Sequence, residues 1–347
     1  MGRKIPKLTS GQSQKSAVEK NTKACEDIYI KGDKVSDMKD FKDVLENHFV
    51  SKPSRDTEFA SQGLCHIGEY TVITSYDPTD RSGFFKSVGN HFIGAEDWFD
   101  TTTRNSRIDI VDSEGRTKTV NLDNKSHVGG IAFHEETGKI YVSNDSKINI
   151  YDINDLAAVK DGGTLKPKDS FDFEKDSGGN AAYVQIHGDN LYAGRFSEEK
   201  NAKLIKYELD DEGNPSNPKT YKVPYAKVQG MEILEHNGKE YFIFSTSYGR
   251  GNDSQLVFAE LTDEGKFETI TKMTIPCMSE QISFNEDGKL GIVFESDSTY
   301  YTGSDMEIGN VLYIDANEVF KEHVEDWDRT LLMDEPSLKD DIGIATI

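Results

Sequence analysis

One pattern occurs five times along the 347-residue chain and limits its fold more than any other feature. In each copy a short apolar strand follows a glycine or a polar residue, the chain turns, and a second strand ends in polar residues. The clearest copy has its first strand in residues 227–234, a turn at Asn237 and Gly238, and its second strand in residues 239–250. The residues that begin the first strands are Gly63, Gly130, Ala182, Gly230 and Gln281.

Third strands with alternating apolar residues follow in residues 107–112, 147–152, 203–209, 255–261 and 310–315. A turn and an outer strand come after most of them, so four strand-like runs recur about every 50 residues. Such a period is typical of propeller blades, because a small sheet buries both faces only when neighbouring sheets stack on it. We therefore predict an all-β fold, a five-bladed β-propeller rather than one of six or seven blades.

The two ends of the chain differ from the repeats. We expect a flexible polar tail in residues 1–23, an N-terminal strand and helix in 24–58, the propeller in 59–335 and a C-terminal tail in 336–347. The helix is predicted over residues 36–49, where apolar residues recur on one helical face. The fifth blade lacks an obvious outer strand, which residues 28–30 or residues 330–333 could supply.

The first interval between repeats is longer than the others because of an insertion in residues 80–103. Its aromatic residues stand among glycines and are Phe84, Phe85, Phe92, Trp98 and Phe99. Loops longer than about 15 residues are often functional. We expect either a cover over a ligand site or a loop that packs its aromatic residues on itself.

Composition and charge disfavour several functions. The chain has 62 acidic and 40 basic residues and a formal net charge of −22, which disfavours nucleic acid as a partner. No segment reaches the roughly 20 apolar residues of a membrane span. The acidic turns lack the ligand spacing of a calcium loop, and no cysteine motif for a metal is present, so we expect no metal and no other cofactor.

Two further expectations concern the state of the molecule. Cys65 and Cys277 belong to the first and last repeats, so closure of a ring could bring them together in a disulfide. We expect a monomer. The compartment stays open between a secreted protein whose signal peptide was removed and a cytoplasmic protein.

Polar residues precede the first strands and would converge where these strands begin. They are Gln62, His127, Asn180, Gln229 and Glu280. They form either a ligand site or the hydrated lining of a channel. Glu280 is the only carboxylate and His127 the only imidazole among them, so this pair could supply acid and base catalysis.

A second polar set lies where the second strands end. It contains Ser75-Tyr76-Asp77, Asn144-Asp145, Arg195, Ser247-Tyr248-Gly249-Arg250 and Glu295-Ser296-Asp297, and Trp98 of the insertion could join it. These residues lie either at the same mouth of the ring as the first set or in a separate site at the opposite mouth. The two Ser-Tyr pairs at Tyr76 and Tyr248 could instead be structural.

Several of these motifs resemble those of known propellers. The residues that carry the likeness are Gln62-Gly63-Leu64, residues 127–133, Val228-Gln229-Gly230-Met231 and Ser247-Tyr248-Gly249-Arg250. The stretch from about residue 59 to residue 320 resembles uncharacterised bacterial propellers of the exported kind, and more distantly the five-bladed glutamine cyclotransferase and YncE-like groups. That resemblance implies acidic residues beside the glycines, but Gln62 and Gln229 stand there, so the cyclotransferase activity does not carry over.

Three hypotheses about function follow. The leading one is a propeller that binds a small polar molecule, a peptide or a glycan at the mouth of its central channel. The second is an enzyme of the cyclotransferase, lyase or lactonase type that uses Glu280 and His127. The third is a scaffold whose outer rim contacts other proteins, because a propeller fold implies no single chemistry.

Overall fold

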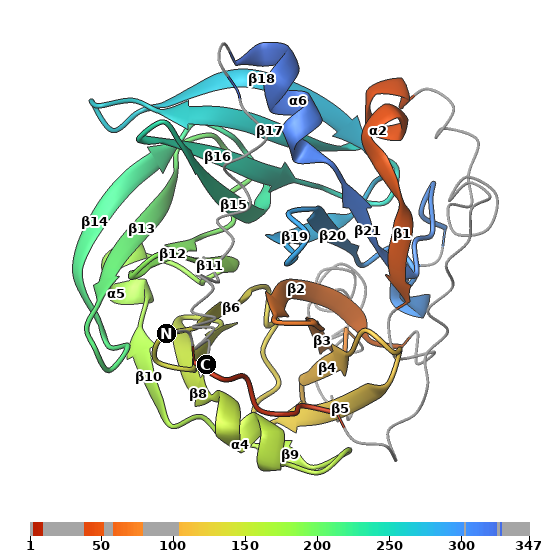
Figure 1. Ribbon diagram of the computed structural model, residues 1–347, viewed down its shortest axis with the longest axis vertical. Coiled ribbons are helices and arrows are strands. Elements are labelled where there is room, and N and C mark those ends of the chain that lie inside the picture. The colour runs from red at the N-terminus through yellow and green to blue at the C-terminus, as the bar shows by residue number, and fades with distance from the viewer. Residues whose placement is uncertain are drawn as a thin grey trace, which may run out of the picture.

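Five sheets stand side by side in a ring, with the first strand of each nearest the centre (Figure 1). The computed structural model describes residues 3–9, 38–51, 58–78, 104–301, 303–324 and 327. Within each sheet the main strands pair antiparallel, mostly in chain order from the centre outwards. The predicted five-bladed β-propeller is confirmed.

The first two blades are joined along the rim. Blade 1 contains β2 (Ala60–Ile67), β3 (Tyr70–Tyr76), β4 (Arg107–Val111) and β5 (Thr117–Leu122). Blade 2 contains β6 (Ile131–His134), β7 (Lys139–Asn144), β8 (Lys147–Asp152) and β10 (Asp169–Asp172). After β8 the helix α4 (Ile153–Ala158) leads to β9 (Thr164–Leu165), which pairs in parallel with β5 of blade 1 before the chain returns to form β10.

The remaining blades repeat the same order. The short helix α5 (Glu174–Ser177) precedes blade 3, which contains β11 (Tyr183–His187), β12 (Asn190–Gly194), β13 (Ala202–Leu209) and β14 (Pro215–Val223). Blade 4 contains β15 (Val228–His236), β16 (Lys239–Thr246), β17 (Ser254–Leu261) and β18 (Phe267–Ile275). Blade 5 contains β19 (Ser279–Phe284), β20 (Leu290–Phe294) and β21 (Asn310–Ile314), with the 3-10 turn η2 (Thr299–Tyr301) between the last two.

The ring is closed by the N-terminal part of the chain. The outer strand of blade 5 is β1 (Leu45–Ser51), which pairs antiparallel with β21. The prediction of a helix over residues 36–49 is therefore wrong beyond Val44, because the helix α2 spans only Lys39–Val44. The two segments proposed for this strand, residues 28–30 and 330–333, lie outside the described residues. Pairing with β1 satisfies the backbone of an edge that β21 would otherwise expose.

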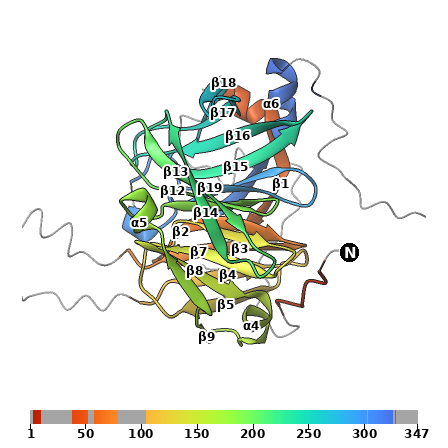
Figure 2. The same cartoon turned by 90° about the vertical axis from the view of Figure 1, so that its left-hand side faces the viewer.

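Five apolar clusters fill the five spaces between neighbouring blades. The cluster between blades 4 and 5 is extended by α2 and by α6 (Ala316–His323), and it includes Phe41 and Phe320. The cluster between blades 5 and 1 is small and includes Val50, Leu64 and Val311. Figure 2 shows α2 and α6 at one end of the long axis and α4 with β9 at the other. Each sheet thus buries its faces against its neighbours, as the repeat predicts.

Two glycines of the repeat are explained by the close approach of first strands near the axis. A Cβ atom on Gly130 would lie 2.4 Å from the backbone nitrogen of Val184 in blade 3. A Cβ atom on Gly230 would lie 2.6 Å from the Cα atom of Gln281 in blade 5. Real Cβ atoms do not tolerate such distances to backbone, so only glycine fits at these positions.

Gln281 occupies the fifth anchor position and links three other strands across the axis. Its Oε1 accepts hydrogen bonds from the backbone nitrogens of Leu64 (3.1 Å) and Ile131 (2.8 Å). Its Nε2 donates to the carbonyl oxygens of Ile131 (2.9 Å) and Val184 (2.7 Å). The side chain is fully buried. One amide thus connects blade 5 to blades 1, 2 and 3.

Part of the predicted N-terminal tail lies against the ring. Within residues 3–9, Leu8 is buried in the cluster between blades 1 and 2, and Arg3 donates to the carbonyl oxygen of Thr137. Ring closure does not join Cys65 and Cys277 in a disulfide, because both are free thiols buried in different clusters. Among the described helices, none has the length and apolar character needed to cross a bilayer.

Candidate functional site

The two polar sets predicted from the sequence lie at the same end of the ring. Antiparallel pairing places the start of each first strand beside the end of the second, with Ser61 opposite Ser75 and Ser279 opposite Phe294. The alternative of a separate site at the opposite end is therefore wrong. We call this end the mouth, formed by residues 61–63, 75–77, 127–130, 228–230, 246–250, 279–281 and 294–301.

Backbone irregularities present three side chains at the mouth. The first strands of blades 1, 4 and 5 each carry one extra residue relative to the second strand, at the positions of Gln62, Gln229 and Glu280. Such bulges bend a strand and redirect a side chain, and they are common beside functional sites. Lys227 and Met278, which directly precede two of these strands, have φ angles of 63° and 62°, in the left-handed region that costs non-glycine residues energy.

Two glutamates form the centre of the mouth. Glu280, which is 2% exposed, is hydrogen-bonded to the side chain of Glu295. Burial and the neighbouring Glu295 raise the pKa of Glu280 well above its ordinary value. This direction favours the protonated form of Glu280, which can donate its hydrogen to Glu295.

Two glutamines contact this carboxyl pair from neighbouring blades. Gln62 Nε2 donates to Glu295 Oε2 at 2.7 Å, and Gln229 Nε2 approaches Glu280 Oε1 at 3.5 Å. The first distance is that of a strong hydrogen bond and the second that of a weak one. The pair is thus held between blade 1 and blade 4.

One polar atom at this position has no partner. Gln62 is fully buried, and its Oε1 accepts no hydrogen bond, although its Nε2 is bonded to Glu295. Exchanging the two amide atoms would place an oxygen against the carboxylate, so the assignment follows from the contact itself. Few buried acceptors in native proteins lack a partner, and each such atom requires an explanation.

Aromatic side chains stand beside the carboxyl pair. The hydroxyls of Tyr76 and Tyr301 are 2.9 Å apart, and the ring of Tyr76 lies 4.3 Å from that of His127 between centroids. Burial, and after it the charge of Glu295, raises the pKa of both tyrosines. Arg250 donates to the carbonyl oxygen of Tyr300 at 2.9 Å and lies over the ring of Tyr301. The mouth therefore joins residues of blades 1, 2, 4 and 5.

His127 is exposed at the mouth, although protein atoms crowd its ring. This crowding lowers the pKa of His127 below its ordinary value, and the open surface of the residue limits the effect. The imidazole is neutral at pH 7. The described hydrogen bonds of Glu280 are with Glu295 and Gln229, so none of them joins it to His127, the base predicted from the sequence.

Four other predicted residues lie apart from the carboxyl pair or outside the described residues. Tyr248 stacks on Phe196 and carries the Lys227 ammonium over its ring. Arg195 donates to the carbonyl oxygen of Gly178, and Asn180 is exposed at the start of blade 3. Trp98 and the insertion of residues 80–103 fall outside the described residues, so the expected cover stays a prediction.

Sequence reasoning placed Glu295 in the second polar set but did not pair it with Glu280, and it did not select Tyr301. Glu295 directly follows β20, and the antiparallel pairing of β19 with β20 brings it beside Glu280, so the hairpin itself was a usable signal. Tyr301 lies in η2, a turn between β20 and β21 that has no equivalent in blades 2, 3 and 4.

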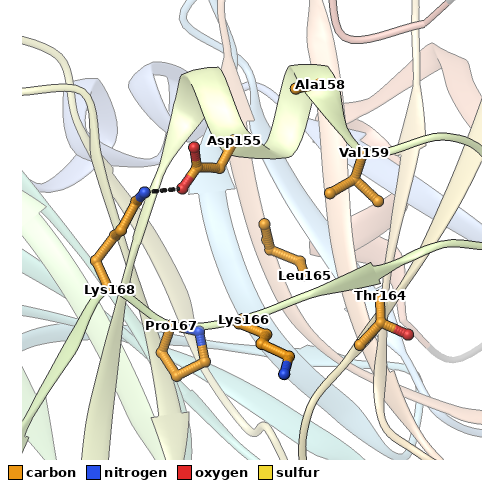
Figure 3. Close-up of a pocket in the computed structure, with 8 residues that line it drawn as sticks. All are labelled: Asp155, Ala158, Val159, Thr164, Leu165, Lys166, Pro167 and Lys168. Carbon is orange, nitrogen blue, oxygen red and sulfur yellow. Dashed lines mark ion pairs between the residues drawn. The ribbon is translucent and has the colours of Figure 1, made fainter.

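Two features away from the mouth could bind other groups. His134, Glu136 and Asp189 place ligand atoms within 4.8 Å of one another, but the two carboxylates are exposed. A hollow of about 470 Å³ lies on the rim between α4 and the segment from Thr164 to Lys168, where Asp155 pairs with Lys168 at 2.7 Å (Figure 3). Neither feature has a described contact with the carboxyl pair.

Among the comparisons with known proteins, only those with solved structures show a similarity. The sequence matches no protein-family model, and no curated protein matches it. A protein of unknown function from Bacteroides caccae is similar over 54% of this chain and 61% of its own, with 10% identity and a TM-score of 0.34. An alpha-L-arabinofuranosidase, CtGH43, from Clostridium thermocellum is similar over 70% of this chain and 83% of its own, with 12% identity and a TM-score of 0.41. The resemblance to cyclotransferase and YncE-like propellers stays a prediction.

Proposed function

We propose that the protein binds a small polar molecule, or the polar end of a peptide or glycan, at the mouth of the propeller. The observation that carries this proposal is the unpartnered Oε1 of Gln62, which is buried beside the carboxyl pair. Leaving a buried polar atom without a partner costs about 1–3 kcal/mol. A ligand that donates a hydrogen bond to this oxygen would recover that free energy.

The aromatic and polar groups of the mouth support the same proposal. Tyr76 and Tyr301 offer hydroxyls, Glu280 and Glu295 offer carboxyl oxygens, and the ring of His127 lies beside Tyr76. Ligand sites commonly combine apolar surface with a few convergent polar groups. These groups come from separate blades, so they meet only in the folded ring.

The proposal is tested by ligand binding to matched variants. Small polar ligands, including sugars and dipeptides, are screened by the shift they cause in thermal unfolding, and hits are measured by calorimetry. Gln62→Met keeps the length of the side chain but removes both polar atoms, and we expect it to weaken binding about tenfold or more. Asp155→Asn in the rim hollow is the control and leaves affinity unchanged. Equal affinity in the Gln62 variant and the wild type refutes the proposal.

A second candidate is an enzyme of the cyclotransferase, lyase or lactonase type. The observation that favours it is the buried Glu280, whose pKa is raised, beside a second carboxyl group, since two carboxyl groups with unequal proton affinity serve as acid and base in many enzymes. His127 lies at the same mouth and offers a neutral imidazole as the base.

The geometry disfavours glycoside hydrolysis by the carboxyl pair. Two carboxyl groups in hydrogen-bond contact are closer together than the separation of about 5 Å or more that glycosidases use across the scissile bond. For the other reaction types, Glu280→Gln would abolish turnover of a bound ligand while binding and folding persist. Turnover that survives in both Glu280→Gln and His127→Ala refutes the enzyme hypothesis.

A further inference from the structure

We propose that the mouth recognises a protonated primary amine, which donates hydrogen bonds to Glu280, Glu295 and Gln62. This inference rests on the proposed function and names the chemical class of its ligand. An amino sugar and the N-terminus of a peptide both carry this group.

Among the described residues, the polar atoms at the carboxyl pair are mostly acceptors. Gln62 offers an unpartnered oxygen, and each glutamate offers carboxyl oxygens, while the described donors on the pair are the amide nitrogens of Gln62 and Gln229. An ammonium group has three donors and no acceptor. It can therefore donate to Glu280, Glu295 and the Gln62 oxygen together, whereas a hydroxyl group has a single hydrogen to donate.

Charge favours the same ligand class. Two carboxyl groups in contact cannot both ionise without an added cation, because like charges at this distance repel strongly. A proton on Glu280, which its raised pKa favours, reduces this repulsion when no ligand is bound. When an ammonium group enters, the proton of Glu280 passes to the buffer, and the positive charge of the ligand replaces it, so the net charge of the site does not change.

Aromatic groups beside the pair fit the rest of such a ligand. The rings of Tyr76 and His127 lie 4.3 Å apart between centroids, and the Tyr301 hydroxyl is hydrogen-bonded to that of Tyr76. Aromatic faces attract ammonium groups and pack against the carbon skeleton attached to them. The formal net charge of −22 also raises the local concentration of cationic ligands.

The test compares ligands that differ only in the amine. Glucosamine is compared with glucose, and glycylglycine with N-acetylglycylglycine, so that the two pairs also distinguish an amino sugar from a peptide N-terminus. We expect at least one amine to bind about tenfold or more tightly than its neutral partner. Calorimetry at pH 7 in buffers of different ionisation enthalpy should show release of about one proton for each amine bound.

Two variants separate the proton exchange from simple binding. Glu280→Gln keeps a donor facing Glu295 but has no proton to lose, so proton release should disappear and the preference for the amine should fall to near equality. Gln62→Met should weaken the binding of the amine but leave the number of protons released per bound ligand unchanged. Asp155→Asn should behave like the wild type, and thermal unfolding confirms that each variant is folded.

The possible outcomes distinguish this inference from the proposed function. If neutral ligands bind as tightly as amines and lose affinity in Gln62→Met, the amine inference fails and the mouth remains a ligand site. If calcium chloride alone binds with proton release and blocks the amines, the site takes an inorganic cation and the inference also fails. If no ligand of the panel binds, or if binding is the same in the wild type and all mouth variants, both proposals fail.

Discussion

Replacement of Gln281 by methionine tests how the ring is held together at its axis. The change keeps side-chain length and removes all four hydrogen bonds of the amide, which leaves the backbone nitrogens of Leu64 and Ile131 and the carbonyl oxygens of Ile131 and Val184 without this partner. A buried polar group left unpaired costs about 1–3 kcal/mol, so four of them cost about 4 kcal/mol or more. Domains have total stabilities of about 5–15 kcal/mol, so the loss is a large fraction.

Urea unfolding followed by circular dichroism measures this loss as a change in the free energy of unfolding. The matched control is Gln255→Met, because Gln255 is exposed on β17 and such surface changes shift stability by about 0.5 kcal/mol or less. A loss below about 1 kcal/mol for Gln281→Met would refute the reasoning, because unpaired buried groups cost at least that much each.

Gln281→Glu separates the acceptor function of this side chain from its donor function. The carboxylate still accepts from the two backbone nitrogens but faces the carbonyl oxygens of Ile131 and Val184, so its folded-state pKa should rise above the unfolded value. A raised pKa contributes stability at low pH that is lost as the pH rises through the folded pKa. We therefore expect Gln281→Glu to be closest to the wild type near pH 4 and weakest at pH 8; no pH dependence in the difference would contradict this account.

Two further predictions concern the same inner strands. Burial raises the pKa of Glu232 to about 7, so the stability that the protonated form contributes is lost between about pH 4.5 and pH 7. In urea unfolding, the free energy of unfolding of Glu232→Gln should therefore rise relative to that of the wild type by up to about 3 kcal/mol from pH 4 to pH 8. A constant difference would show that Glu232 titrates normally. Gly130→Ala should lower the free energy of unfolding by about 1–3 kcal/mol, because the new Cβ meets backbone of blade 3. Gly251→Ala, whose Cβ would meet only a side-chain atom at 3.8 Å, should be near neutral, and equal effects of the two changes would exclude close strand approach as the cause.

The architecture could be predicted because the physical cause of the repeat, the packing of small sheets on one another, is visible in the sequence. Four-strand units with a glycine at the start of the first strand need neighbouring sheets, and Gly130 and Gly230 indeed lie against the backbone of the next blade. The closing strand could not be predicted. Val44 and Leu45 fit an apolar helix face as well as the start of a strand, and only the unpaired edge of β21 decides for β1.

The site was predicted in part for a similar reason. Gln62, Gln229 and Glu280 share one position in the repeat, so alignment of the copies found them before any geometry was known. Glu295 needed the pairing of β19 with β20 to place it beside Glu280, and Tyr301 lies in a turn without an equivalent in blades 2, 3 and 4. A repeat pattern identifies site residues that recur in each copy, whereas a site residue in a single insertion can be identified only from the folded structure.

Infrared spectroscopy of the Glu280 carboxyl group tests most directly whether this group is protonated until an amine binds. A protonated carboxylic acid absorbs apart from a carboxylate, so the difference spectrum between the wild type and Glu280→Gln at pH 7 isolates the state of Glu280. The account predicts a protonated carboxyl band at pH 7 that disappears when glucosamine or glycylglycine saturates the mouth. A Glu280 that ionises near the ordinary glutamate pKa of about 4.3, with no such band at pH 7, would contradict it.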